Sequence, residues 1–242
     1  MRVLKLSFLA SLLLIFMVQC GNPPKKKQKN TVKEVVNQDS IKAKKRADSI
    51  ALVEKEKDTF ELNEENAIKF FFDYAKNLKQ DKVRLTTTKG SFTVQLYDNV
   101  PYHKANFIYL TRKKYFDSTQ FHRVVPNFMI QGGNSDDMRT AKKRGKIGRY
   151  LLPPDTRKGH KHHRGTISMP SSERDNPHKL ASPFEFFIVT TNPGSYHLDG
   201  DYTPFGRVIE GMDVVDKINQ TPIDTGEWPK KNIYILKAEV LD

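Results

Sequence analysis

Cysteine, tryptophan and long apolar runs are scarce in this chain of 242 residues. Its one cysteine excludes an intrachain disulfide, so disulfide usage says nothing about the redox compartment. The longest apolar run, Leu6–Val18, has 13 residues, whereas a membrane-spanning helix needs about 20. Acidic residues are also few, with 28 Asp and Glu against 41 Lys and Arg, which gives a formal net charge of +13. Internal repeats are absent.

The first 19 residues predict a signal peptide. Arg2 and Lys5 precede the apolar run, and this order of charged and apolar segments is typical of export signals. The single cysteine, Cys20, follows directly, and resembles the lipidated first residue of a mature bacterial lipoprotein. Gln19 departs from the small residue that usually precedes such a cysteine. The alternatives are an uncleaved anchor and ordinary secretion with an incidental thiol.

The predicted location is the cell envelope, with a lipid at Cys20 anchoring the protein to a membrane. Gly21 does not resemble an inner-membrane retention signal, which favours the outer membrane with the domain facing the periplasm. Residues 20–62 have no apolar periodicity that would build a core, and their lysines gather at Lys25–Lys29. This segment is predicted to be a polar tether, either lying on anionic lipid headgroups or serving as a solvated spacer.

Residues 63–81 predict an amphipathic helix that leads into the folded domain. Asn63 is a suitable N-cap, and glutamates follow it in the first turn. Helical spacing predicts one apolar side, made of Ile68, Phe71, Phe72 and Ala75. We expect this side to pack on the main domain or on a partner chain.

From residue 82 onward the apolar period changes to two, which predicts strands with one polar face. Two alternating runs, 83–87 and 92–96, flank Lys89-Gly90 and predict an antiparallel hairpin. A helix is predicted from Pro101, because proline is tolerated in a first turn. A last strand alternates within Lys230–Leu241. Residues 82–242 are therefore predicted to form a mainly β domain large enough to bury a core.

One segment, Phe121–Gly133, carries the most chemical information in the chain. It reads FHRVVPNFMIQGG and places the permanently charged Arg123 near phenylalanine and methionine side chains. A cation beside an apolar wall, without a nucleophile or an acid–base pair, suits chemistry that shifts electron density without moving protons. Rotation about an X–Pro peptide bond is such a reaction, with a barrier of roughly 18–20 kcal/mol. A donor aimed at the prolyl nitrogen stabilises the twisted state more than the planar one.

The FHR and P-x-F-M-x-Q-G-G elements of this segment resemble the cyclophilin family of peptidyl-prolyl cis–trans isomerases. Later stretches resemble family blocks in the same order: Gly165–Met169, Phe186–Val189, Leu198–Gly200, Phe205–Val208 and Gly211–Ile218, the last of which resembles the second helix of the family. The resemblance covers residues 82–242 and implies a closed eight-stranded antiparallel β-barrel flanked by two helices. It also implies prolyl isomerase activity on polypeptides, without a metal or other cofactor. The alternative for FHR alone is an ordinary strand with a surface arginine.

Arg123 is the predicted catalytic residue, and by resemblance it is the donor to the prolyl nitrogen. Gln131 is similar to the family glutamine that orients this arginine and bonds the substrate backbone. The resemblance predicts four lining residues of the proline pocket: Phe128, Met129, Phe187 and Leu198. The alternative for each of them, Met129 above all, is a plain core residue. His122 is expected to point away from Arg123 into the barrel, since successive strand residues face opposite sides.

Several predicted substrate-binding positions depart from the family pattern. Glu185 replaces a second glutamine, and an ionised carboxylate cannot donate a hydrogen bond to a substrate carbonyl. It is also a candidate to pair with the catalytic arginine and divert it. Pro170-Ser171 replaces a small residue and an asparagine, His197 replaces a tryptophan, and Tyr202 replaces a histidine. Because the changes lie on the side that binds the peptide backbone, isomerase activity is expected with a reduced rate or an altered peptide preference.

An insertion at about 139–164 is strongly basic. It carries ten Lys or Arg and one acidic residue, and this net +9 accounts for the whole excess of +8 in residues 82–242. Such a patch attracts acidic partners, either peptides or phosphorylated lipid headgroups, while export argues against nucleic acid; a solvated loop is the alternative. Its histidines, His160, His162 and His163, lack the further convergent ligands that a zinc site needs, so no metal is predicted.

Three functions remain from the sequence. The first is a lipid-anchored prolyl isomerase that assists the folding of exported proteins. The second is a chaperone or scaffold that binds proline-containing segments with weak or no catalysis, because Glu185 has blunted the reaction. Turnover of an X–Pro peptide separates these two. The third makes the basic insertion the main functional surface, which docks an acidic partner.

Overall fold

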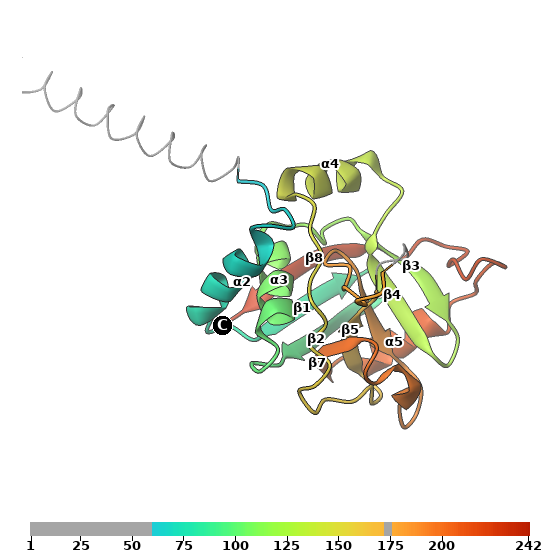
Figure 1. Cartoon of the computed structure of the whole chain (residues 1–242). Coiled ribbons are helices and arrows are strands. Elements are labelled where there is room, and N and C mark those ends of the chain that lie inside the picture. The colour runs from blue at the N-terminus through green and yellow to red at the C-terminus, as the bar shows by residue number, and fades with distance from the viewer. Residues whose placement is uncertain (1–59, 172–175) are drawn as a thin grey trace, which may run out of the picture. The chain divides into compact units, whose positions relative to one another are not determined.

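The computed structural model describes residues 60–171 and 176–242 (Figure 1). The predictions for the signal peptide, for Cys20 and for the tether up to residue 59 lie outside these residues. Within the described ranges, no helix has both the length and the apolar character needed to cross a membrane.

Eight strands form one sheet in which all neighbouring pairs run antiparallel. They are β1 (Lys82–Thr87), β2 (Gly90–Leu96), β3 (Gln120–Val125), β4 (Met129–Asn134), β5 (Thr166–Met169), β6 (Phe186–Val189), β7 (Thr203–Glu210) and β8 (Ile235–Leu241). Their order in the sheet is β3-β4-β6-β5-β7-β2-β1-β8. The predicted hairpin is β1–β2, with Val83 opposite Val94. The prediction of a mainly β, eight-stranded antiparallel fold is confirmed.

The two outermost strands, β3 and β8, meet through a short seam. Gln120 forms an isolated antiparallel bridge with Tyr234, the residue directly before β8. On either side of it, the Phe121 amide donates to the Ile233 carbonyl at 2.9 Å, and the Ile235 amide donates to the Thr119 carbonyl at 2.8 Å. These contacts satisfy backbone groups that a sheet edge would otherwise expose to other chains.

The described residues contain four α-helices and one short 3₁₀ helix. They are α2 (Ala67–Lys76), α3 (Pro101–Arg112), α4 (Met138–Ile147), α5 (Met212–Asn219) and the 3₁₀ turn Tyr196–Leu198. The sequence predicted α3, which begins at its proline, and α5. Helix α4 was not predicted, because the segment was interpreted as a basic loop. It begins at Asp137, whose side chain accepts the Arg139 amide, and Lys143 fastens it by donating to carbonyl groups that follow α3.

Helix α2 is shorter than predicted, and only part of its predicted apolar side is buried. Ala67 and Phe71 are fully buried, and Phe71 packs edge-on against Tyr109 of α3 at 5.8 Å between ring centroids. Ile68 and Phe72, which were predicted to share the buried side, are exposed. Figure 1 shows α2 lying beside α3. The prediction that this helix packs on the main domain is therefore confirmed, through Phe71 and Ala75 of the predicted side together with Phe70 and Tyr74.

The predicted end of the tether at residue 62 is also wrong. Leu62 is 1% exposed, and its amide donates to the carbonyl of Ile147 at the end of α4. The neighbouring Gly148 has φ +116°, and a Cβ atom there would lie 1.9 Å from the Leu62 carbonyl oxygen. Only glycine fits this close approach, so residues 60–62 belong to the folded unit.

Candidate active site

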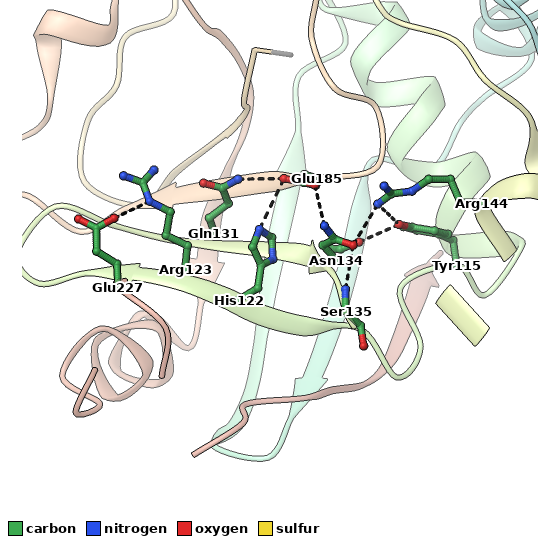
Figure 2. Close-up of polar contacts among 10 residues, drawn as sticks. Tyr115, His122, Arg123, Gln131, Asn134, Ser135, Arg144, Glu185 and Glu227 are labelled. Atoms are coloured by element: carbon green, nitrogen blue, oxygen red, sulfur yellow. Dashed lines mark hydrogen bonds and ion pairs between the residues drawn. The ribbon is translucent and has the colours of Figure 1, made fainter. Parts of the chain in front are cut away.

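The FHR motif lies on β3, and a register shift in this strand decides which way its side chains point. Phe121 pairs with Gly132 and Arg123 pairs with Gln131, so His122 is left as the extra residue between two pairs. Phe121 enters the core at 1% exposure, whereas Arg123 faces outward. Because the extra residue breaks the alternation, His122 points to the same side as Arg123 (Figure 2), where it is 9% exposed and lies against Glu185 and Trp228. The prediction that it points into the barrel is wrong.

Arg123 opens onto a cavity of about 80 Å³ on the outer face of β4 and β6. Its walls are Arg123, Phe128, Met129, Gln131, Pro170, Phe187, Leu198 and Tyr202. Met129 and Phe187 are buried with Val189 in a small apolar cluster that is separate from the main core. Three partly buried side chains pack against this small cluster: Phe128, Leu198 and Tyr202. These side chains therefore build a wall of the cavity and are not part of the main core.

Several of the predicted substrate-binding residues also contact one another. Tyr202 stands edge-on to Phe187, at 5.7 Å between ring centroids and an interplanar angle of 89°. His197 does not line the cavity itself but stacks on Phe128, at 5.5 Å between ring centroids. Ser171 does not line the cavity, because it pairs with Ala181 and its hydroxyl accepts from Asn176.

Arg123 is held by a carboxylate that the sequence did not single out. Its Nε donates to Oε2 of Glu227 at 2.6 Å, and both side chains are partly exposed. The partner considered from the sequence, Glu185, does not contact it. The expected orienting bond from Gln131 is not formed either, although the two residues are opposite each other in the β3–β4 register.

Glu185 organises a separate polar network beside the cavity (Figure 2). Its two carboxylate oxygens accept from Gln131 Nε2 at 2.9 Å and from Asn134 Nδ2 at 3.2 Å, and His122 Nε2 lies 3.5 Å away. Burial opposes its ionisation, but the contacts with His122 and Gln131 outweigh burial and hold the pKa of Glu185 below its usual value. An ionised Glu185 thus takes an amide N–H of Gln131 that would otherwise face the cavity.

The network continues away from the cavity to α4. Asn134 accepts from a terminal nitrogen of Arg144 at 3.3 Å, and the same nitrogen donates to the Tyr115 hydroxyl at 2.9 Å. The Arg144 guanidinium also lies 5.0 Å from the ring centroid of Phe184. The helix that the sequence did not predict therefore contacts residues that position the site.

A buried histidine supports the cavity wall from behind. His162 is 0% exposed; its Nδ1 lies 2.8 Å from an Asp199 oxygen and its Nε2 lies 3.1 Å from the Ser168 hydroxyl. Its ring is nearly parallel to that of Phe187, at 6.0 Å. Burial lowers the pKa of His162, and the bond to Asp199 opposes this only in part. Ser168 is fully buried in β5, so this chain of hydrogen bonds supports the wall and offers no accessible nucleophile.

The three histidines of the basic insertion have separate partners. His160 stacks on Tyr97, and His163 bonds the Tyr196 hydroxyl. Over the described ranges, no three His, Cys, Asp or Glu side chains are grouped in a way that could hold a metal ion.

The arrangement provides a fixed cation at the rim of an apolar cavity that is large enough for a small apolar group. It contains no accessible nucleophile. Such a site can bind an apolar ring and stabilise a developing lone pair beside it.

The sequence model described as "Cyclophilin type peptidyl-prolyl cis-trans isomerase/CLD" matches residues 82–240. Because this match covers more than half of the chain, the protein belongs to the cyclophilin-type peptidyl-prolyl cis-trans isomerase family. The predicted enzyme class is confirmed at the level of the family.

Similar proteins come from distant organisms. Peptidyl-prolyl cis-trans isomerase-like 1 of Neurospora crassa is 36% identical over 161 residues, which cover 66% of this chain and 93% of that protein. A peptidyl-prolyl cis-trans isomerase of Acinetobacter baylyi is 31% identical over 169 residues, 67% of this chain and 87% of its own length. Peptidyl-prolyl cis-trans isomerase-like 2 of Rhizopus delemar is 34% identical, but the match spans only 30% of that longer protein.

A solved structure shows the same fold. The crystal structure of a cyclophilin type peptidyl-prolyl cis-trans isomerase from Cryptosporidium parvum aligns with a TM-score of 0.57 and 26% identity, over 67% of this chain and 98% of that one. A second structure of that protein, determined in the presence of the dipeptide Ala-Pro, aligns with a TM-score of 0.56.

Proposed function

We propose that this chain accelerates cis–trans rotation of X–Pro bonds in polypeptides, with Arg123 as the catalytic donor. The observation that carries the proposal is the position of its guanidinium beside the apolar wall of Phe128, Met129 and Phe187. A proline ring placed against this wall brings its nitrogen to the cation, which stabilises the twisted amide. The Ala-Pro dipeptide used with the Cryptosporidium parvum protein supports proline as the recognised residue.

The test compares the rates at which the wild type and the Arg123→Ala variant isomerise an X–Pro peptide, both measured by exchange spectroscopy. Loss of one preorganised donor typically costs a factor of about 10²–10³. We expect a drop of that size in kcat/KM, with Arg207→Ala, an exposed arginine on β7, as the matched control. Equal rates for wild type and Arg123→Ala would show that the guanidinium is not the catalytic group. Peptide binding without turnover in the wild type would support the chaperone or scaffold function instead.

Location and further partners extend this proposal. A lipid at Cys20 would tether the isomerase to the envelope, where it would act on exported proteins as they fold. The mass of the mature amino terminus tests whether this lipid is present.

The exposed basic side chains of α4 and its flanks favour an acidic partner, whose binding should weaken with salt; they are Lys142, Lys146 and Arg149. Full closure of the barrel, implied by family resemblance, belongs to the same proposal and is supported by the seam at Gln120.

A further inference from the structure

The loop between α5 and β8 is a tightly turned segment that approaches the active site. The Asp224 carboxylate accepts the amides of Gly226 and Trp228, each at 2.9 Å, which closes the loop on itself. Glu227 sits within this turn at φ +65°, a left-handed conformation that is uncommon for a residue with a side chain. Residues held in such a conformation against their preference are concentrated at functional sites.

Glu227 is attached to β3 twice. Its carbonyl accepts the amide of Val124 at 2.9 Å, and its carboxylate accepts the Nε–H of Arg123 at 2.6 Å. The next residue, Trp228, places its ring 6.0 Å from that of His122. The backbone contact fixes the distance between loop and strand, so the carboxylate reaches Arg123 from a defined position.

We infer that Glu227 is a positioning residue for the isomerase reaction, an inference that rests on the proposed function. The ion pair uses Nε and, among the described residues, the two terminal nitrogens of Arg123 have no hydrogen-bond partner. Figure 2 shows them directed away from Glu227. An arginine side chain loses rotamer entropy when it binds. Holding it through Nε in the free enzyme removes part of that cost and leaves the terminal donors for the substrate.

No other described side chain fulfils this role. Gln131, the neighbour of Arg123 across the strands, gives its amide group to Glu185 at 2.9 Å. The carboxylate of Glu185 is in turn occupied by Gln131 and Asn134. The orientation of the guanidinium therefore depends on a residue 104 positions further along the chain.

The experiment compares Glu227→Ala and Glu227→Gln in the full chain, with Asp213→Ala, an exposed carboxylate of α5, as the control. In Glu227→Ala we expect kcat/KM to fall about tenfold, with most of the change in kcat. Glu227→Gln keeps an oxygen that accepts the Nε–H, so it should remain within about threefold of wild type. In ¹⁵N spectra, the Arg123 Nε–H resonance should move in Glu227→Ala and not in Asp213→Ala.

The outcomes separate this inference from the proposed function. If Arg123→Ala loses activity while Glu227→Ala retains it, the positioning role is wrong and the proposed function stands. If Glu227→Ala is faster than wild type, the carboxylate holds Arg123 away from the substrate, and the inference is overturned. If Arg123→Ala itself has no effect, the proposed function fails. A Glu227→Ala defect that Glu227→Gln does not rescue would also contradict the inference, because the contact would then act through charge and not through orientation.

Discussion

At the scale of single residues, the site is shaped by competition for hydrogen-bond donors. Glu185 has accepting oxygens only, and it satisfies them with Gln131 and Asn134. Each amide N–H held in this way is one fewer donor for a peptide carbonyl. The carboxylate therefore stabilises the free enzyme at the expense of substrate contacts.

Glu185→Gln should raise activity and lower stability. A glutamine donates to a substrate carbonyl and frees Gln131, and one neutral hydrogen bond contributes about 0.5–1.5 kcal/mol, a factor of about two to ten in kcat/KM. Loss of the charged acceptor should reduce the free energy of unfolding by about 1–2 kcal/mol. Peptide turnover and urea unfolding measure the two effects, with Glu239→Gln on β8 as control. Unchanged turnover would contradict the competition for Gln131.

The same substitution has a pH signature. Since the pKa of Glu185 is lowered in the folded state, the unfolded chain binds a proton first as the pH falls. Its contribution to stability is complete above the unfolded pKa of about 4.5 and is lost as the pH falls through the folded pKa. As the pH is lowered from about 5 through the folded pKa of Glu185, the free energy of unfolding should therefore fall less in Glu185→Gln than in wild type.

The sequence predicted the side chains of the cavity because the FHR…FM-x-Q pattern is local and the strand geometry places it. Arg123, Phe128, Met129 and Gln131 all line the cavity as expected. The sequence did not predict the hydrogen-bond partners of these side chains. Whether Arg123 meets Glu185 or Glu227 depends on the direction of side chains from distant segments, and neither spacing nor residue type determines that direction.

At the scale of elements, alternation predicted the β1–β2 hairpin, since period two is a strong signal where one face is buried. Helix α4 escaped prediction because only Thr140 and Ile147 of its ten residues are buried, which leaves almost no apolar periodicity. The predicted orientation of the His122 side chain was wrong for another reason. A single extra residue in β3 reverses the alternation, and nothing in the sequence marks its position.

Helix α3 contains a buried histidine that should make the fold sensitive to acid. His103 is 0% exposed, packs near Phe205 at 6.2 Å, and neither ring nitrogen has a partner among the described residues. Burial lowers its pKa to about 3. Between pH 6.5 and about 3, the unfolded chain binds a proton that the folded chain does not, so stability falls as the pH falls through this range.

The His103→Phe variant should remove this dependence. It keeps an aromatic ring against Phe205 and has no proton to bind, so its free energy of unfolding should fall less from pH 7 to pH 4 (both approximate), by up to about 3 kcal/mol. Urea titrations over this range measure the slope, and His178→Phe, at an exposed histidine, is the control. Parallel pH curves for wild type and His103→Phe would rule out this source of acid sensitivity.

At the scale of the whole molecule, the folded unit is larger than the family domain. The family match begins at residue 82, yet buried contacts of the described residues already begin at Leu62. Leu62 and Phe71 are buried in the main core, and Phe71 also contacts Tyr150, which follows α4, at 5.5 Å between ring centroids. Helix α2 thus contacts both α3 and the segment that follows α4.

Two neighbouring phenylalanines test this extension of the fold. Phe71 is 0% exposed and Phe72 is 50% exposed on the same helix, so Phe71→Ala should lower the free energy of unfolding by about 3–5 kcal/mol and Phe72→Ala by less than about 0.5 kcal/mol. Both variants should keep wild-type isomerase rates below their melting temperatures, because neither residue contacts the cavity. Urea unfolding monitored by near-UV circular dichroism gives the comparison. Equal losses in the two variants would mean that α2 is an accessory to the tether; a loss confined to Phe71→Ala makes it part of the domain that holds Arg123.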